Sequence, residues 1–222
     1  MAKMAGMGER GKRGKRGKKV AVAMSGGVDS SVTAYLLKEA GYEVTGITMD
    51  LLELGCKIEK SDTCCSLQAF EDAKDVASRL GIKHYIIDCK TEFEQRIINP
   101  FVNEYLNGYT PNPCVVCNSM IKFGLLLDRA RQLGAEYLST GHYAKIEQKN
   151  TRFVIRKGID TNKDQSYFLY RLTQEQLSKA IMPLGNYQKV DVRKIASMLG
   201  LKIAAKPESQ EICFIPQNNY QE

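Results

Sequence analysis

A short polar loop near the start of the chain carries the residues best suited to bind an anion. Residues 25–31 read Ser-Gly-Gly-Val-Asp-Ser-Ser and lie between an apolar run, 20–24, and a helix-like segment, 31–40. Glycines let the backbone approach a ligand and present N–H groups, and a helix N-terminus adds partial positive charge. The loop lacks the lysine of G-x-x-x-x-G-K-[ST] phosphate loops, so it favours the α- and β-phosphates of a nucleotide over γ-phosphoryl transfer. The alternative is an ordinary glycine-rich turn between a strand and a helix.

Cysteine thiolates are the second group that could do chemistry. The chain has seven cysteines, with a Cys-x-x-Cys pair at 114–117 and a distant cysteine at Cys213. A thiolate is a nucleophile and a metal ligand, and its pKa falls beside positive charge or a metal ion. Zinc is the weaker candidate, because there is no second Cys-x-x-Cys pair and the chain has only two histidines. A sulfur carrier, an iron–sulfur cluster held by three thiolates and a purely structural pair remain open.

Alternating strands and helices must position these residues. We predict strands at 19–24, 44–49, 84–88 and 137–140, and helices at 31–40, 67–80, 92–106 and 121–133. This alternation indicates a doubly wound α/β fold, in which helices cover both faces of a parallel sheet. After residue 142 we predict a hairpin of 145–148 and 153–157 around Asn150, then short helices at 174–180 and 189–199.

Several polar positions fall where such a fold binds ligands. Doubly wound sheets bind ligands beyond the carboxyl ends of their strands. The glycine loop and the pairs 49–50, 88–89 and 141–142 all follow predicted strands. The sequence therefore predicts one ligand site at this edge of the sheet.

Composition limits the class of protein. The chain has 222 residues, of which 43% are hydrophobic, enough for one α/β domain with a sizeable core. No apolar stretch approaches the roughly 20 residues of a membrane span, and no apolar segment of the signal-peptide type follows the basic N-terminus. We therefore expect a cytoplasmic protein, with no membrane partner and with its cysteines in a reducing compartment.

The formal net charge of +7 lies entirely in the N-terminal segment. Residues 1–19 contain eight Lys or Arg and one Glu, whereas the rest of the chain contains 24 basic and 24 acidic residues. We expect residues 1–18 to form a basic disordered tail. Such a tail either adds non-specific affinity for RNA phosphates or is a dispensable solvated arm.

Five sequence blocks, in their order along the chain, resemble the bacterial tRNA-specific 2-thiouridylases. The blocks are residues 25–31, 109–118, 140–143, 162–169 and 208–215, and the resemblance runs from about residue 19 to residue 215. The first block is similar to the pyrophosphate loop of enzymes that split ATP into AMP and pyrophosphate. The resemblance implies a Rossmann-like fold of the adenine nucleotide alpha-hydrolase type. It also implies adenylation of the wobble uridine, position 34 of tRNA, followed by replacement of O2 with sulfur to give 2-thiouridine.

The resemblance further implies roles for individual residues. For ATP with Mg²⁺ it implies contacts from Ala23, Met24, Ser25, Gly26, Gly27, Val28, Asp29, Ser30, Met49 and Gly141. For the tRNA it implies contacts from Asn112, Pro113, Cys114, His142, Lys163, Asp164 and Gln165. Asp29 either helps to organise magnesium or holds the loop itself. Without the resemblance, His142 and the polar stretch 163–165 would be interpreted as structural.

Two sulfur mechanisms remain open. In the persulfide mechanism of the family, Cys213 carries sulfur received from a donor protein, and Cys117 assists its release through a disulfide or as an acid/base. The best-known family pattern has aspartate in place of Cys114 and Ser-Thr-Gly-x-Cys in place of residues 209–213. In the alternative, Cys114, Cys117 and Cys213 hold a [4Fe–4S] cluster with one open iron site. For Cys56, Cys64 and Cys65 the alternatives are a sulfur-acceptor relay and plain loop residues, of which we favour the loop residues, and we interpret Cys89 as a core residue.

We expect three regions along the chain. They are a basic tail, 1–18, a pyrophosphate-loop ATP-binding catalytic domain, 19–200, and a catalytic cysteine loop with the start of an incomplete central domain, 201–222. Family members continue into a further small domain and a β-barrel, so we expect a C-terminal truncation. The rival functions are a 4-thiouridine synthase, a tRNA lysidine synthetase, an amidotransferase-linked synthetase, and a non-catalytic RNA- or nucleotide-binding module. The paired cysteine blocks disfavour the amide-forming enzymes, which need no sulfur carrier.

Overall fold

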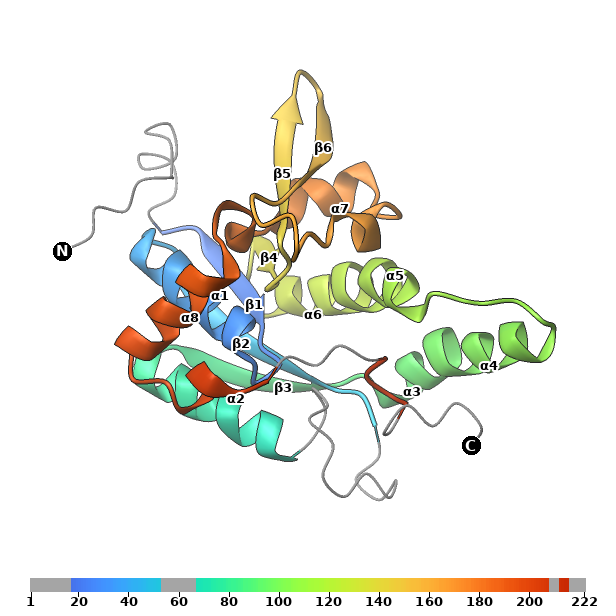
Figure 1. Cartoon of the computed structure of the whole chain (residues 1–222), viewed down its shortest axis with the longest axis horizontal. Coiled ribbons are helices and arrows are strands. Elements are labelled where there is room, and N and C mark those ends of the chain that lie inside the picture. Colours follow the sequence, from blue (N-terminus) through green and yellow to red (C-terminus); the bar gives the residue numbers. More distant parts are fainter. Residues whose placement is uncertain (1–16, 53–66, 208–211, 216–222) are drawn as a thin grey trace.

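A five-stranded parallel sheet forms the centre of the molecule (Figure 1). The computed structural model describes residues 17–52, 67–207 and 212–215. The strand order is β3-β2-β1-β4-β7, and every neighbouring pair is parallel. The strands are β1 (Lys19–Ala23), β2 (Glu43–Asp50), β3 (Lys83–Asp88), β4 (Tyr137–Ser139) and β7 (Ala180–Ile181). The predicted doubly wound α/β fold is therefore confirmed.

Helices cover both faces of this sheet. The α-helices are α1 (Val28–Glu39), α2 (Leu67–Leu80), α3 (Lys90–Phe93), α4 (Asn99–Leu106), α5 (Pro113–Cys117), α6 (Leu127–Gln132), α7 (Gln174–Lys179) and α8 (Lys189–Met198). Two π-helical segments, η2 (Glu94–Ile98) and η3 (Asn118–Leu126), continue α3 and α5, and short 3₁₀ turns are η4 (Ser166–Leu169), η5 (Pro183–Asn186) and η6 (Lys202–Ala205). Within the described ranges, no helix combines the length and the apolar character needed to cross a membrane.

Strand β1 lies at the centre of two hydrophobic layers. Val20 and Val22 pack with α1, α2 and α8 on one face, and Ala21 packs with η3, α6 and α7 on the other. All three side chains are fully buried. A strand covered on both faces is apolar without alternation, which explains the continuous apolar run before the glycine loop. The sheet thereby holds that loop at a fixed edge.

The helix after the loop begins earlier than predicted. We expected it at Ser31, but α1 starts at Val28, with Gly27 as an extended N-cap residue. The Ser31 hydroxyl donates to the Gly27 carbonyl over 2.8 Å, and the Ser30 hydroxyl donates to the same oxygen over 3.2 Å. Ser30 and Ser31, which belong to the glycine-loop block of the sequence, therefore lie in the first turn of α1. Their hydroxyls bond back to the loop instead of pointing away from it.

The two long helices also differ from the prediction. The segment 92–106 is helical, but a π-helical stretch precedes Pro100, which occupies the start of α4. The helix expected at 121–133 instead begins at Pro113 and runs through α5, η3 and α6 to Gln132. The Asn112 side chain caps it by accepting from the Val115 N–H over 3.3 Å, and proline is favoured at the first helical position. The Cys-x-x-Cys pair is thus helical.

A separate hairpin projects beyond the sheet (Figure 1). Its strands are β5 (Ala144–Lys149) and β6 (Arg152–Lys157), and Asn150 in the turn has a φ of 55°. Asparagine tolerates this left-handed conformation better than most residues, so the predicted turn residue is confirmed. Strand β7 was not predicted, because its two residues form too short an apolar segment to stand out.

Candidate functional site

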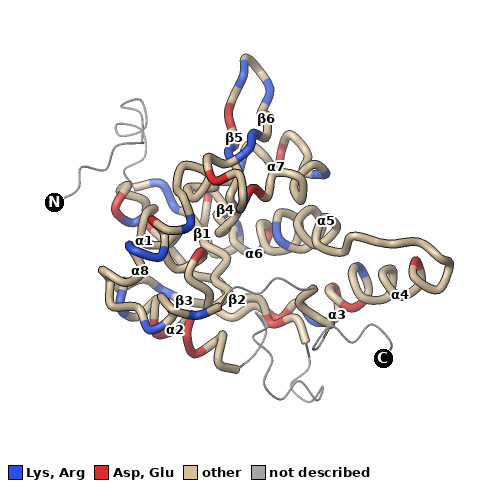
Figure 2. Tube along the Cα trace, in the orientation of Figure 1, with Lys and Arg blue, Asp and Glu red and all other residues tan. Residues whose placement is uncertain are grey.

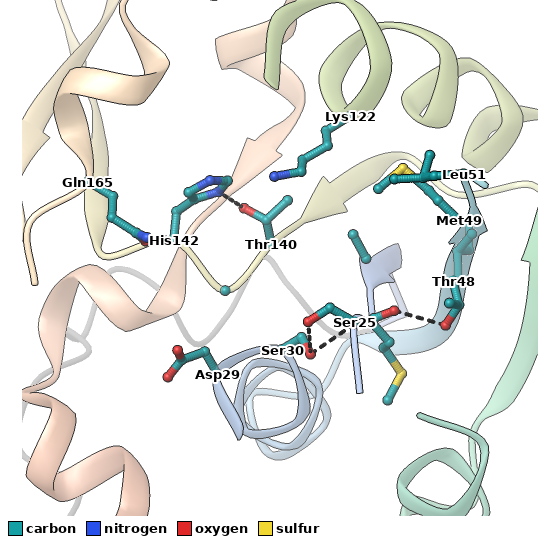
Figure 3. Close-up of a pocket in the computed structure, with 14 residues that line it drawn as sticks. Ser25, Asp29, Ser30, Thr48, Met49, Leu51, Lys122, Thr140, His142 and Gln165 are labelled. Atoms are coloured by element: carbon teal, nitrogen blue, oxygen red, sulfur yellow. Dashed lines mark hydrogen bonds between the residues drawn. The ribbon is translucent and has the colours of Figure 1, made fainter. Parts of the chain in front are cut away.

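One cavity lies where the predicted ligand site was expected. It is bounded by the carboxyl ends of β1, β2 and β4 and by the N-terminus of α1, and its volume is about 290 Å³. Figure 3 shows Ser25 and Ser30 on one side of it and Lys122 reaching in from the opposite side. The lining residues are Ala23, Met24, Ser25, Asp29, Ser30, Ile47, Thr48, Met49, Leu51, Lys122, Thr140, Gly141, His142 and Gln165.

The glycine loop is shaped by close contact with α2. Gly26 has a φ of 69°, and a Cβ atom there would lie 2.4 Å from the Ala69 carbonyl oxygen. A Cβ at Gly27 would meet only the Ser25 hydroxyl, at 3.4 Å. The Ser25 N–H donates to the Ser30 hydroxyl over 3.2 Å, which closes the loop over the first turn of α1. Gly26 is therefore required by the fold, whereas Gly27 keeps the space beside the loop open.

Asp29 is held by two partners from distant segments. Both of its carboxylate oxygens accept from the Lys189 ammonium at 2.7 Å, and Oδ1 also accepts from the Tyr143 hydroxyl at 2.7 Å. The Lys189 backbone N–H donates to Asp160 over 2.9 Å, which fixes the start of α8. Asp29 was expected either to help organise magnesium or to hold the loop itself, and these contacts support the second role. Neither Lys189 nor Tyr143 was among the predicted site residues.

The end of β4 closes the cavity from a second side. A Cβ at Gly141 would lie 3.0 Å from both the Asp29 Cβ and the Ser30 nitrogen, so only glycine lets this turn approach α1. The next residue, His142, has its Nδ1 2.7 Å from the Thr140 hydroxyl. Burial, assisted by the charge of Lys122, holds the pKa of His142 well below its usual range. A neutral imidazole therefore faces the cavity at physiological pH.

The polar stretch 163–165 contributes one cavity residue and one structural residue. Gln165 lines the cavity, and its side-chain oxygen accepts from the Tyr143 N–H over 3.1 Å. The Asp164 carboxylate accepts from the Gly158 N–H over 2.9 Å and from the Ser166 hydroxyl over 2.7 Å, so it holds its own loop. Lys163 is half-buried on the same loop.

The cysteine segments gather in a third apolar cluster. Cys117 is 8% exposed and lies among Cys89, Phe93, Ile97 and Ile121, and Cys213 packs against this cluster. The neighbouring Phe214 ring packs edge-on against two rings of the α3–α4 stretch, Phe93 and Phe101, with centroid distances of 5.8 and 5.2 Å. The cluster therefore joins the residue 212–215 segment to the helix that carries Cys117.

The remaining cysteine predictions have different outcomes. Cys114 is half-buried on α5, in the turn capped by Asn112 and Pro113. Burial, together with Glu92 and Asp88, raises the pKa of Cys89 to about 12, so this thiol stays protonated and belongs to the core as predicted. Residues 208–211 and three cysteines, Cys56, Cys64 and Cys65, lie outside the described residues. Among the residues that are described, no three Cys, His, Asp or Glu side chains gather closely enough to hold a metal ion.

Two exposed features of the surface are rich in basic or aromatic side chains. The β5–β6 hairpin has five basic residues and one acidic residue, a local net charge of +4, and its tube carries several blue segments in Figure 2. The basic residues are Lys145, Lys149, Arg152, Arg156 and Lys157. The exposed rings of Tyr167, on η4, and Tyr170, the residue that follows η4, lie 5.7 Å apart. The positive charge of the hairpin is not apparent from the net charge of the chain, because acidic residues elsewhere balance it.

Comparison with protein families finds one match over most of the chain. Residues 18–217 match the family described as "tRNA methyl transferase HUP domain". The chain is 57% identical over 206 residues to the "tRNA-specific 2-thiouridylase MnmA 2" of Thermoanaerobacter sp. (strain X514), covering 91% of this chain and 57% of the relative. It is 53% identical over 203 residues to a protein of the same description from Clostridium tetani, with the same coverage. The chain thus spans little more than half the length of these curated relatives.

Solved structures share the fold at low identity. One is the "U34-tRNA thiolase NcsA from Methanococcus maripaludis with its [4Fe-4S] cluster", with a TM-score of 0.55 and 21% identity over 89% of this chain and 62% of that chain. Another is a "4-thiouridine synthetase - RNA complex with bound ATP", with a TM-score of 0.54 and 19% identity over 89% of this chain and 45% of that chain. These similarities support the architecture alone.

Proposed function

This chain belongs to the tRNA methyl transferase HUP domain family, and from that membership we propose that it is the ATP-binding catalytic part of a tRNA-uridine 2-sulfurtransferase. The protein would adenylate the wobble uridine, position 34, and replace O2 with sulfur, releasing AMP and pyrophosphate. Its curated relatives carry the matching description, tRNA-specific 2-thiouridylase.

A single observation carries the proposal: the glycine loop and the helix that contains Cys117 both contribute residues to the wall of one cavity. The cavity is lined by the loop residues Ser25 and Ser30 and by Lys122 of η3. The same continuous helix contains Cys117, five residues before Lys122. Activation of an oxygen and delivery of sulfur need neighbouring sites of these two kinds.

The residues of the cavity fit the phosphate end of a nucleotide. Gly27 leaves the space beside the loop open, Gly141 lets the end of β4 approach α1, and α1 points its N-terminus at the cavity. Uridine O2 is a poor leaving group, and its adenylation would make AMP the leaving group instead. Magnesium would enter with the phosphates and neutralise their charge. The neutral imidazole of His142 can hydrogen-bond an uncharged base without repelling a neighbouring cation.

We propose the persulfide route for sulfur transfer. Cys213 would carry the terminal sulfur of a persulfide received from a sulfur-donor protein, and this sulfur would attack C2 of the adenylated uridine as AMP leaves. The Cys117 thiolate would then attack the Sγ atom of Cys213. The bond between this Sγ and the sulfur now attached to C2 would break, which releases 2-thiouridine and forms a Cys117–Cys213 disulfide. An external thiol would reduce this disulfide. Support comes from the packing of Cys213 against the cluster that contains Cys117.

The cluster alternative fits the described side chains less well. A [4Fe–4S] cluster would need the Cys114, Cys117 and Cys213 thiolates to converge on its irons. No group of three metal-binding side chains is found in the described part of the chain, so we route no step through a cluster.

Charge and aromatic surface support an RNA partner. Exposed basic side chains such as Lys149 and Arg152 neutralise phosphates, and exposed rings such as Tyr167 and Tyr170 stack on unpaired bases. The basic composition of residues 1–18 would add to the same attraction. Adenylation of a wobble base also needs that base to leave its stack, which costs a few kcal/mol.

The products of ATP cleavage test this function. With α-³²P-labelled ATP and wobble-uridine tRNA, the protein should release labelled AMP only when the tRNA is present. Asp29→Ala should abolish this release, because it removes the contact that joins the loop to Lys189. ATP binding without AMP formation would favour a non-catalytic module, and tRNA-independent formation of ADP would contradict the proposal.

A further inference from the structure

Lys122 is held in the cavity by a neutral partner. Its ammonium donates to the Asn118 side-chain oxygen over 2.9 Å, one turn earlier in η3. Asn118 is only 2% exposed, and its amide nitrogen donates to the Phe168 carbonyl over 3.0 Å. Asn118 is therefore fixed by the neighbouring turn, and it in turn limits where the Lys122 ammonium can lie. Within η3 the π-helical geometry widens the turn, a feature that is frequent at functional sites.

The positive charge of Lys122 is not neutralised by the described part of the chain. No carboxylate among the described residues forms an ion pair with it. Lys189, near the same loop, differs, because its ammonium donates to both oxygens of the Asp29 carboxylate. Lys122 also contributes to the lowered pKa of His142, which places its charge close to that ring. Of these two lysines, Lys122 is the one whose charge can serve a ligand.

The wall opposite Lys122 attracts an anion as well. Ser25 and Ser30 lie there, at the N-terminus of α1, as Figure 3 shows. Backbone N–H groups at a helix N-terminus favour a bound phosphate, but the loop lacks the lysine of other phosphate loops. An anion in the cavity would therefore lie between a helix end and an ammonium group.

We propose that Lys122 supplies the charge that the loop lacks and binds the α-phosphate of the nucleotide from the wall opposite α1. This assignment rests on the proposed function, because it takes an adenine nucleotide as the ligand. The α-phosphate is the phosphate that remains on the adenylated uridine and departs with AMP. Lys122 also follows Cys117 by five residues on one continuous helix. Its charge would stabilise the leaving AMP as the C2–O2 bond breaks.

Binding of AMP and adenosine separates the phosphate contact from the base contact. We would measure both affinities by calorimetry for the wild type, Lys122→Met and Lys122→Arg. Lys122→Met should weaken AMP by about 10- to 100-fold, the value of a charge-assisted hydrogen bond in a partly buried site, and leave adenosine unchanged. Lys122→Arg should retain most of the AMP affinity. Lys83→Met removes a lysine at the opposite end of the sheet and should change neither affinity.

The possible results distinguish the role of Lys122 from the proposed function of the protein. A wild type that binds AMP more tightly than adenosine, with Lys122→Met unchanged, would overturn the role of Lys122 and leave the proposed function intact. A wild type that binds no adenine nucleotide would overturn the proposed function and this inference together. Retained adenosine binding in Lys122→Met shows that the variant is folded, and if that variant does not fold, Lys122→Gln provides the same comparison.

Discussion

The Lys189 ammonium lies 2.7 Å from each carboxylate oxygen of Asp29, although the two residues are 160 positions apart in the sequence. Asp29 is in the first turn after the glycine loop, and Lys189 begins α8. Their side chains are 30% and 10% exposed, so water screens the pair only in part. The contact therefore ties α8 to the loop that borders the cavity.

Loss of both partners should destabilise the fold by less than the sum of the two single losses. Lys189→Met leaves a mostly buried carboxylate without its cation, and we expect it to lower the free energy of unfolding by about 2–3 kcal/mol. Asp29→Asn should cost a similar amount, and the double variant should recover at least about 1 kcal/mol of the summed loss. Urea unfolding of the four proteins measures this coupling. Strictly additive losses would show that the two side chains do not stabilise each other.

The two glycines of the loop should respond differently to alanine. Gly26→Ala combines a left-handed backbone with a Cβ 2.4 Å from the Ala69 carbonyl oxygen, so we expect a loss of about 3 kcal/mol or more. Gly27→Ala meets no atom closer than 3.4 Å and should change stability by less than about 1 kcal/mol. Thermal and urea unfolding compare the pair directly. Equal losses would contradict the tight packing of the loop on α2.

Stability should fall on mild acidification because of the histidines. Burial lowers the pKa of both His84 and His142 below 6.5, with smaller contributions from Lys74 and Lys122. The unfolded chain then binds more protons below pH 6.5, so the free energy of unfolding decreases as the pH falls, by up to about 1.4 kcal/mol per pH unit for each histidine. His142→Gln should remove its share of this slope, measured by urea unfolding between about pH 7.5 and about pH 5.5. The same slope in the wild type and in His142→Gln would refute the shift.

The basic hairpin should control the salt dependence of tRNA binding. Lys149→Gln with Arg152→Gln removes two charges near the turn, so the slope of log affinity against log salt should fall by about 2. The control, Lys83→Gln with Lys194→Gln, removes two charges from β3 and α8 and should leave the slope unchanged. Filter binding at several salt concentrations measures both. An unchanged slope in the hairpin variant would exclude this surface from the RNA contact.

Much of the fold could be predicted because its signals are local. Helix α2 was predicted with its observed bounds, since apolar spacing defines it and Gly81 ends it. The early start of α1 was missed because Ser30 and Ser31 occur in loops and in helix caps alike. The start of α5 was signalled by Asn112-Pro113, a cap residue followed by the favoured first helical residue, but the pair was interpreted as a binding stretch.

The cavity residues beyond the motifs could not be predicted, because they depend on packing between distant elements. Lys189 and Tyr143 reach Asp29 only after α8 packs on α1 and the chain turns at Gly141. The only sequence feature that points to Lys122 is its four-residue spacing from Asn118. Many surface pairs on helices have the same spacing, so it does not identify a site residue. The assembly of Cys213 near the Cys117 cluster likewise rests on the aromatic packing of Phe214.

The proposed sulfur transfer is tested by the 2-thiouridine content of tRNA, measured by nucleoside mass spectrometry after incubation with the protein, ATP, Mg²⁺ and a persulfide donor. We expect 2-thiouridine from the wild type, none from Cys213→Ser, and continued tRNA-dependent AMP release by that variant. Cys114→Ser should retain thiolation, because the persulfide route does not use this thiol. Thiolation by Cys213→Ser at the wild-type rate would contradict the sulfur-carrier role of Cys213, and thiolation that tracks bound iron and fails in Cys114→Ser would replace the persulfide route with a cluster.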